Sequence, residues 1–170
     1  ERGAIVTDSR MRTNQPEVYA AGDVNGRSML AHTAYREAEV AVNTMLGKRD
    51  NMRYDAIPAV LYTNPELSGV GYTEAAAAAA GLDARTVALP MRYSGRYVAV
   101  NEGGDGIFKL VVNNRDNTIL GAQALCNYSS EFIIAAASFI EQRLTLDDIK
   151  EIVFPHPTVS EIIREAVFQA

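Results

Sequence analysis

The sequence of 170 residues has one cysteine, two histidines and no tryptophan. A single cysteine, Cys126, allows no intramolecular disulfide, and two well-separated histidines do not give the spacing of a zinc site. We expect Cys126 to end a strand as a small buried apolar residue. These shortages exclude the disulfide-stabilised and zinc-stabilised classes of small domain, and we predict no metal site.

Long apolar runs and an excess of basic residues are also missing. No apolar stretch approaches the roughly 18 residues that span a bilayer. The 16 Lys and Arg against 21 Asp and Glu give a net charge of −5, which disfavours a nucleic acid partner. The start has neither an initiator methionine nor the apolar region of a signal peptide. We therefore expect a cytoplasmic piece of a longer chain, with no membrane partner.

What the sequence does contain is enough apolar material, 48% of its residues, for a sizeable core. A polar, charged segment at residues 47–55 marks the expected boundary between a first domain, 1–50, and a second, 51–170. In the first domain the apolar pattern predicts two strands and a helix. These are strands at 4–7 and 18–21 and a helix at 29–46, whose apolar stripe comprises Leu30, Ala34, Ala38, Ala41, Val42 and Met45.

The second domain groups its expected strands apart from most of its helices, which is typical of an α+β fold with an antiparallel sheet flanked by helices. A hairpin is expected where two apolar segments meet at the turn-rich "NNRDN". The predicted turn "GGDG" at 103–106 precedes it. The predicted strands are 58–63, 68–72, 85–89, 97–100 and the two hairpin segments, and the predicted helices are a short one between Thr73 and Gly81, 129–143, 146–152 and 159–169.

The stretch "FPHPTVSE" at 154–161 holds His156 between two prolines that restrict its backbone. Two interpretations compete. In the first, Thr158 and Glu161 form a T-x-x-E capping box at the start of the last helix, and His156 is a turn residue. In the second, the Glu161 carboxylate orients the imidazole as a general acid-base group. Spacing alone favours the capping box.

A second group of candidate residues lies where a predicted strand ends and a helix begins. Asp23 follows "VYAAG", and its carboxylate either caps a turn or accepts hydrogen bonds from a polyol at the mouth of an α/β sheet. The start of the following helix would turn its free amides toward an electron-rich ring such as a flavin. His32, in the first helical turn, is either a packing residue or part of that site.

Four motifs, in this order and spacing, carry a resemblance that covers essentially the whole chain. They are "T-x-x-x-x-VYAAGDV" (13–24), "MLAHTA" (29–34), "YTNPELSGVGYTE" (62–74) and "HPTVSE" (156–161). Together they resemble the C-terminal portion of the dihydrolipoamide dehydrogenases, within the FAD-dependent pyridine nucleotide-disulfide oxidoreductase family. The resemblance implies that residues 1–50 are the C-terminal return segment of an FAD-binding domain and residues 51–170 an interface domain that builds a homodimer.

The resemblance also implies roles for individual residues. Asp23 would bind the ribityl chain of FAD, and the backbone of Met29, Leu30, Ala31 and His32 would lie along the flavin. His156 would be the acid-base catalyst, held by Glu161 and acting on the dithiol-disulfide site of the partner subunit. The implied activity is oxidation of dihydrolipoamide with NAD through FAD and a redox disulfide. The implied partners are the lipoyl domains of 2-oxoacid dehydrogenase or glycine cleavage complexes.

The sequence departs from the family pattern by large omissions. The glycine-rich FAD loop, the redox cysteine pair and the NAD domain are absent, so we expect this chain alone to be inactive and to bind FAD weakly or not at all. Two alternatives stay open. A glutathione reductase-like disulfide reductase typically carries a second glutamate where this chain has Ile162, and a non-catalytic dimerisation module would use the histidine turn only as structure.

Overall fold

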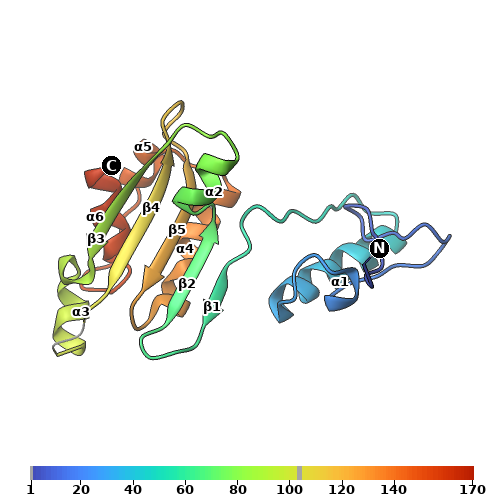
Figure 1. The fold of residues 1–170 in the computed structure, drawn as a ribbon, viewed down its shortest axis with the longest axis horizontal. Helices are drawn as coiled ribbons and strands as arrows, with labels where there is room; N and C mark the ends of the chain where they lie inside the picture. Colours follow the sequence, from blue (N-terminus) through green and yellow to red (C-terminus); the bar gives the residue numbers. More distant parts are fainter. Residues whose placement is uncertain (1, 103–104) are drawn as a thin grey trace. The chain divides into compact units, whose positions relative to one another are not determined.

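The computed structural model describes residues 2–102 and 105–170 (Figure 1). The chain divides into two compact units between Tyr54 and Asp55, slightly beyond the boundary expected from composition. We call the part up to Tyr54 unit 1 and the part from Asp55 unit 2, and describe each by itself. The expected turn at 103–106 includes Gly103 and Gly104, which lie outside the described residues.

Among its described residues, unit 1 contains one α-helix, α1 (Ala31–Met45), and a 3-10 turn, η1 (Asp23–Asn25). The prediction of strands at 4–7 and 18–21 is wrong. Among the described residues the pairing of these segments is limited to a single bridge, Arg12 with Tyr19, and isolated backbone hydrogen bonds. A strand requires a continuous ladder of partners, and these segments instead line a cleft.

The helix α1 buries only part of the apolar stripe predicted for it, with Ala41 buried and Ala38 exposed. Val42 and Met45 are exposed, whereas Glu37 and Thr44 are buried. The polar face is buried because it has backbone partners. The amide of Gly22 donates to the Glu37 carboxylate at 2.6 Å, and the Thr44 hydroxyl lies 3.2 Å from the carbonyl of Arg10, to which it donates. Local periodicity could not reveal these contacts. The buried residues of α1 are Thr33, Glu37, Val40, Ala41 and Thr44.

Unit 2 is built on a five-stranded sheet in the order β1-β2-β5-β4-β3, with every neighbouring pair antiparallel. The α+β fold class and the central hairpin are therefore confirmed. The hairpin pairs Ile107 with Leu125 and Phe108 with Ala124. The strands are β1 (Ala59–Leu61), β2 (Leu67–Gly71), β3 (Ala84–Pro90), β4 (Ile107–Asn113) and β5 (Ile119–Leu125).

The helices of unit 2 begin where the sequence places good caps. Thr73 caps α2 (Glu74–Ala79), and Thr145 forms a complete capping box with Asp148 at α5 (Leu146–Lys150). The predicted strand at 97–100 is wrong, because it lies in α3 (Gly95–Val100), where the Ser94 hydroxyl accepts from the Tyr97 amide. The remaining elements are α4 (Ser129–Glu141), α6 (Glu161–Gln169) and the 3-10 turn η2 (Met91–Tyr93).

The core lies between one face of the sheet and the helices α4 and α6 (Figure 1). Phe108 on β4 packs against Phe132 on α4, with ring centroids 6.1 Å apart. Cys126, directly after β5, is buried as predicted. The expected stripes of both helices are confirmed, with Ile140 only partly buried. The buried stripe residues are Phe132, Ile133, Ala136 and Ala137 of α4, and Ile162, Ile163, Ala166 and Val167 of α6.

The motif "YTNPE" has a structural role at the start of α4. The Glu66 carboxylate accepts hydrogen bonds from the Ser130 amide at 2.9 Å and from the Ser130 hydroxyl at 3.0 Å. A carboxylate at a helix N-terminus satisfies free amides and opposes the helix dipole. Glu66 therefore ties the segment before β2 to the first turn of α4. No helix in the described part of the chain is long and apolar enough to cross a membrane.

Candidate functional site

His156 lies on the turn between α5 and α6, and its peptide bond to Pro157 is cis. Its Nδ1 is 2.9 Å from Oε1 of Glu161, the first residue of α6. The other carboxylate oxygen, Oε2, accepts from the amide of Thr158 at 2.8 Å. Since Ile162 and Ile163 are fully buried, the helix that carries Glu161 is anchored in the core. The structure thus brings His156 and Glu161 together on a well-supported turn.

The turn contains only half of the expected capping box. The Thr158 hydroxyl donates to the carbonyl of Pro155 at 2.9 Å and lies 3.0 Å from the Ser160 hydroxyl. The N-cap of α6 is Ser160, and it makes no side-chain capping bond. The prediction that Thr158 caps the last helix is therefore wrong. One Glu161 oxygen makes the backbone bond of such a box, and the other is left for the imidazole.

The charges at this turn suit proton transfer. The Thr158 amide above all, and then His156, lower the pKa of Glu161 below its ordinary value of 4.5, so the carboxylate is ionised at neutral pH. Glu161 is 19% exposed, whereas the His156 side chain is 81% exposed. A carboxylate on Nδ1 fixes the tautomer and leaves Nε2 to accept a proton. Nε2 has no hydrogen-bond partner within the described residues.

Sequence reasoning missed Ser94, which supports this turn from a distant part of unit 2. Its side chain is 1% exposed, and its hydroxyl donates to the carbonyl of Thr158 at 3.1 Å while accepting from the Tyr97 amide. The only local signal is a serine three residues before a buried aromatic. A largely apolar cleft of about 510 Å³ lies beside the turn, lined in part by Val100, Tyr128, Phe132, Ile134, Pro157 and Val159.

The second group of candidate residues lies in unit 1. Asp23 is exposed at the start of η1, and it lines a cleft of about 520 Å³ together with Asn25, Gly26 and Met29. Leu30, Ala31 and His32 do not line this cleft; they form the N-cap and first turn of α1. The structure therefore brings Asp23 and Met29 to one cavity and leaves the other three expected residues outside it.

The donors and acceptors of this cleft fit a polyol chain such as the ribityl of FAD. The side-chain amide nitrogen of Asn25 is buried and has no partner among the described residues, so it is an available donor. The Asp23 carboxylate supplies acceptors. At Gly26, φ is +70° and an added Cβ would come within 2.7 Å of the Cβ of Ala4. A side chain there would distort the wall of the cleft.

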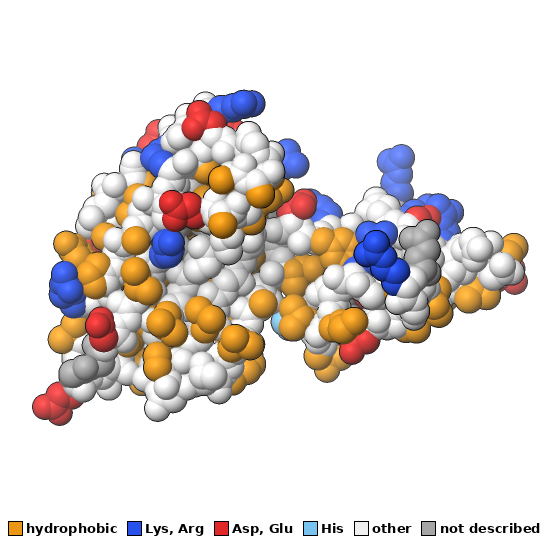
Figure 2. All heavy atoms as spheres, in the orientation of Figure 1, with side chains coloured by type: hydrophobic (Ala, Val, Ile, Leu, Met, Phe, Trp, Pro, Cys, Tyr) orange, Lys and Arg blue, Asp and Glu red, His pale blue; other side chains and the backbone are white. Residues whose placement is uncertain are grey.

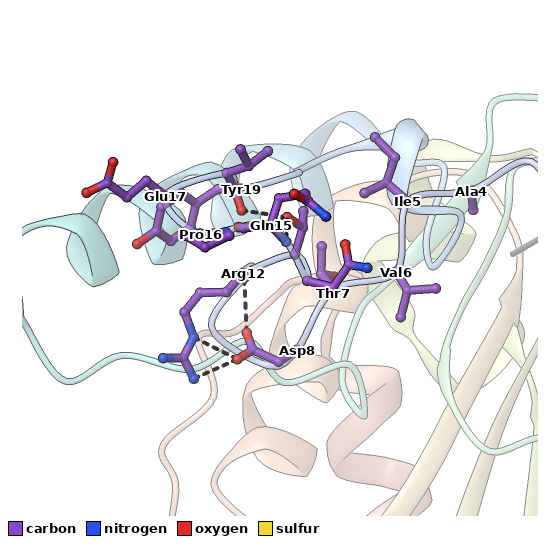
Figure 3. Close-up of a pocket in the computed structure, with 13 residues that line it drawn as sticks. Ala4, Ile5, Val6, Thr7, Asp8, Arg12, Gln15, Pro16, Glu17 and Tyr19 are labelled. Atoms are coloured by element: carbon purple, nitrogen blue, oxygen red, sulfur yellow. Dashed lines mark hydrogen bonds and ion pairs between the residues drawn. The ribbon is translucent and has the colours of Figure 1, made fainter.

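A larger cleft of about 1030 Å³ in unit 1 shares Ala4 and Val6 with the first (Figure 3). Residues of both expected strands, 4–7 and 18–21, line it, and Asp8 and Arg12 form an ion pair at 2.8 Å on its wall. These two side chains are about half exposed, and solvent-exposed pairs of this kind are weak. We assign no chemistry to this cleft.

Comparison with known proteins covers both units. The pyridine nucleotide-disulphide oxidoreductase dimerisation domain matches residues 57–167, and a second domain of the same family, pyridine nucleotide-disulphide oxidoreductase, matches residues 1–38. Dihydrolipoyl dehydrogenase of Bacillus subtilis is 39% identical over 98% of this chain and 35% of the relative. Dihydrolipoyl dehydrogenase 2 of Haloarcula marismortui is 39% identical over 100% of this chain and 36% of the relative.

Solved structures share the fold of this chain. LpdA from Mycobacterium tuberculosis superposes with a TM-score of 0.90 at 26% identity, over 98% of this chain and 36% of that one. The HOCl-induced flavoprotein disulfide reductase RclA from Escherichia coli has a TM-score of 0.87 at 29% identity, over 99% of this chain and 39% of that one. The chain spans about a third of the length of these proteins. It belongs to the pyridine nucleotide-disulphide oxidoreductase family, whose dimerisation domain occupies residues 57–167.

Proposed function

We propose that the chain is the C-terminal portion of a dihydrolipoyl dehydrogenase, which oxidises dihydrolipoamide with NAD through FAD and a redox disulfide. The observation that carries the proposal is the contact of His156 Nδ1 with the Glu161 carboxylate, which leaves the rest of the ring exposed. A histidine held in this way on a domain of the dimerisation family suits an acid-base group. The dihydrolipoyl dehydrogenases among its relatives support the choice of substrate.

In this mechanism His156 is the base and Glu161 holds it. The carboxylate accepts a hydrogen bond from Nδ1–H, so Nε2 is free to take a proton from the dithiol of dihydrolipoamide. Thiolate rather than thiol is the nucleophile in disulfide exchange, and the base therefore produces the reacting species. The Glu161 charge stabilises the imidazolium that forms. Ser94 and the core residues of α6 keep the imidazole in one place during the transfer.

Unit 1 contributes to the cofactor side of the same enzyme. The Asp23 carboxylate would accept hydrogen bonds from the ribityl hydroxyls of FAD, and the Asn25 amide would donate to that chain. The backbone of residues 29–32 would lie along the flavin. When bound, FAD supplies the two-electron carrier between the dithiol and NAD. These groups are a fraction of the contacts that FAD requires, so the 170-residue chain alone should be inactive and bind it weakly or not at all.

Unit 2 would form a homodimer in which His156 of one subunit serves the disulfide site of the other. The sheet face opposite the core supports an interface, because it carries an apolar row across four strands. Leu61 pairs with Leu67, Leu67 with Leu125, and Leu125 with Ile107, and all four are at least 40% exposed. Apolar rows of this kind mark surfaces that a partner covers. Sedimentation of the full-length protein as a monomer at high concentration would contradict the dimer.

The partners that follow from this activity are the lipoyl domains of 2-oxoacid dehydrogenase or glycine cleavage complexes, and a cytoplasmic location is part of the proposal. One observation weighs against a glutathione reductase-like activity. That group typically has a second glutamate after Glu161, whereas Ile162 is fully buried in the core here. A carboxylate at that position would be buried at high cost. A disulfide reductase activity remains the second candidate, because the structurally similar RclA is a disulfide reductase.

The test uses the full-length flavoprotein that carries this chain and follows flavin reduction by dihydrolipoamide in a stopped-flow instrument. Replacing His156→Gln should slow this half-reaction by about 10² to 10⁴-fold, the range for a lost acid-base group, and should leave hydride exchange between NADH and flavin intact. Glu161→Gln should slow it less. Glu165→Gln, which removes a carboxylate from the same helix, is the control. A normal rate in both variants indicates a non-catalytic module, and faster reaction with glutathione indicates the other reductase.

A further inference from the structure

Glu37 of α1 is a fully buried carboxylate that takes no part in the proposed reaction. Oε2 accepts from the Gly22 amide at 2.6 Å, and Oε1 accepts from the Tyr54 hydroxyl at 2.6 Å. A buried carboxylate is costly unless its oxygens are hydrogen-bonded. Both oxygens of Glu37 are bonded, so this side chain is built into unit 1 with two specific partners.

The first partner of Glu37, Gly22, directly precedes Asp23, which lines the proposed FAD cleft. Gly22 has a φ of +81°, and a Cβ added to it would lie 3.3 Å from the Cβ of Ala34 in α1. The chain therefore approaches α1 closely here, and its amide is turned toward Glu37. The next residue, Asp23, is exposed and lines the 520 Å³ cleft. The bond to Glu37 fixes the Ala21–Gly22 peptide, which lies one residue before Asp23.

The second partner of Glu37, Tyr54, contacts Arg27, which lines the same cleft. The guanidinium of Arg27 lies over the Tyr54 ring, 5.4 Å from its centroid, and donates to the carbonyl of Thr7 at 2.7 Å. Arg27 lines the cleft that contains Asp23. Burial and the hydrogen bond to Glu37 raise the pKa of Tyr54, so its hydroxyl stays protonated and continues to donate. One carboxylate thus braces the cleft through two independent contacts.

We propose that Glu37 is a positioning residue for FAD, acting through the Gly22 amide to hold Asp23 and through Tyr54 to hold Arg27. This inference rests on the proposed function, since it assumes that the cleft receives the polyol of the cofactor. Glu37 touches neither the cofactor nor the substrate. Its effect is to fix the shape of the binding turn before FAD arrives, which lowers the cost of ordering that turn on binding.

The experiment measures the Kd for FAD of the full-length apoprotein by quenching of flavin fluorescence, with visible circular dichroism of the bound flavin and the thermal midpoint of the apoprotein. Glu37→Leu removes both acceptors and should raise Kd by about tenfold or more, the effect of one lost buried hydrogen bond or somewhat more, with an altered dichroism band. Glu37→Gln keeps an acceptor for the Gly22 amide, so its Kd should stay within about threefold of wild type.

Two further variants make the result decisive. Tyr54→Phe leaves the bond between Glu37 and Gly22 and should raise Kd less than Glu37→Leu does. Glu37→Asp retracts the carboxylate by one methylene and takes over as the deciding variant if Glu37→Leu fails to fold. A lowered thermal midpoint with unchanged Kd and dichroism overturns the inference and leaves Glu37 a structural residue. Failure of the wild-type protein to bind FAD would instead overturn the proposed function.

Discussion

The two units of this chain are stabilised by different kinds of contact. In unit 2 one continuous apolar cluster contains residues of the strands β2, β3, β4 and β5 and of the helices α4, α5 and α6. In unit 1 the buried side chains include as many polar groups as apolar ones, and its single helix turns Glu37 and Thr44 inward. Apolar burial is non-directional, whereas hydrogen bonds require particular partners. The comparison shows that one chain can contain a region specified by apolar patterning and another specified by individual polar contacts.

Apolar side chains are exposed on both units (Figure 2), but a helix of unit 1 and a helix of unit 2 differ in how much of their apolar stripe is buried. The helix α1 exposes Val42 and Met45, two residues that its apolar pattern would place inside. The helix α6 buries its apolar stripe completely. The apolar periodicity of a helix therefore identifies its buried face only where the surrounding chain supplies an apolar surface to pack against.

The contrast between the two units predicts that the largest loss of stability follows a substitution in the core of unit 2. Phe108 is fully buried and packs against Phe132, so Phe108→Ala should lower the free energy of unfolding by about 3–5 kcal/mol through lost burial and a cavity. Chemical denaturation of the 170-residue chain, followed by circular dichroism, measures it. A loss below about 1 kcal/mol would mean that the sheet core does not determine the stability of unit 2.

The next effect concerns Cys126, a buried thiol in that core. Burial above all, and then Glu66, raise the pKa of Cys126 to about 12, so the reactive thiolate is rare at pH 8. We expect a thiol reagent to label Cys126 in the folded chain at least about 10³-fold more slowly than in denaturant. Cys126→Ser should cost about 1–3 kcal/mol of stability because it buries a hydroxyl. Rapid labelling of the folded chain would show that this part of the core opens readily.

A smaller effect tests a polar contact within unit 2. The folded-state pKa of Glu161 is lowered from 4.5, so its ionised form contributes stability that is present above pH 4.5 and is lost as the pH falls through the folded pKa. Glu161→Gln should therefore cost about 1 kcal/mol at pH 7, and the difference from wild type should narrow below pH 4.5. Thermal midpoints from pH 3 to 7 measure it, with Glu165→Gln as control. A pH-independent difference would contradict this explanation.

The smallest effect is expected on the exposed face of α1. Val42 is 51% exposed, and Val42→Ala should change the free energy of unfolding by less than about 0.5 kcal/mol, since few contacts are lost and alanine favours helix. The same denaturation experiment measures it. A loss comparable to that of Phe108→Ala would remove the contrast between the two units.

Several elements could be predicted from the sequence because their signals are local. The stripes of α4 and α6 repeat at helical spacing, Thr73 and Thr145 cap their helices, and a turn-rich segment separates β4 from β5. The prediction at 97–100 failed although its alternating valines favour a strand. The serine cap at Ser94 and the burial of Tyr97 outweigh that local preference.

By itself, the sequence determined the fold class and the antiparallel sheet, and it left the pairing of His156 with Glu161 as one of two interpretations. Only the tertiary structure decided which face of α1 is buried, that Thr158 leaves one Glu161 oxygen to His156, and that Ser94 holds the same turn from 64 residues away. Periodicity and capping depend on neighbours within one or two turns. A hydrogen bond between distant segments exists only after the core has brought them together, because its geometry is set by packing rather than by local sequence.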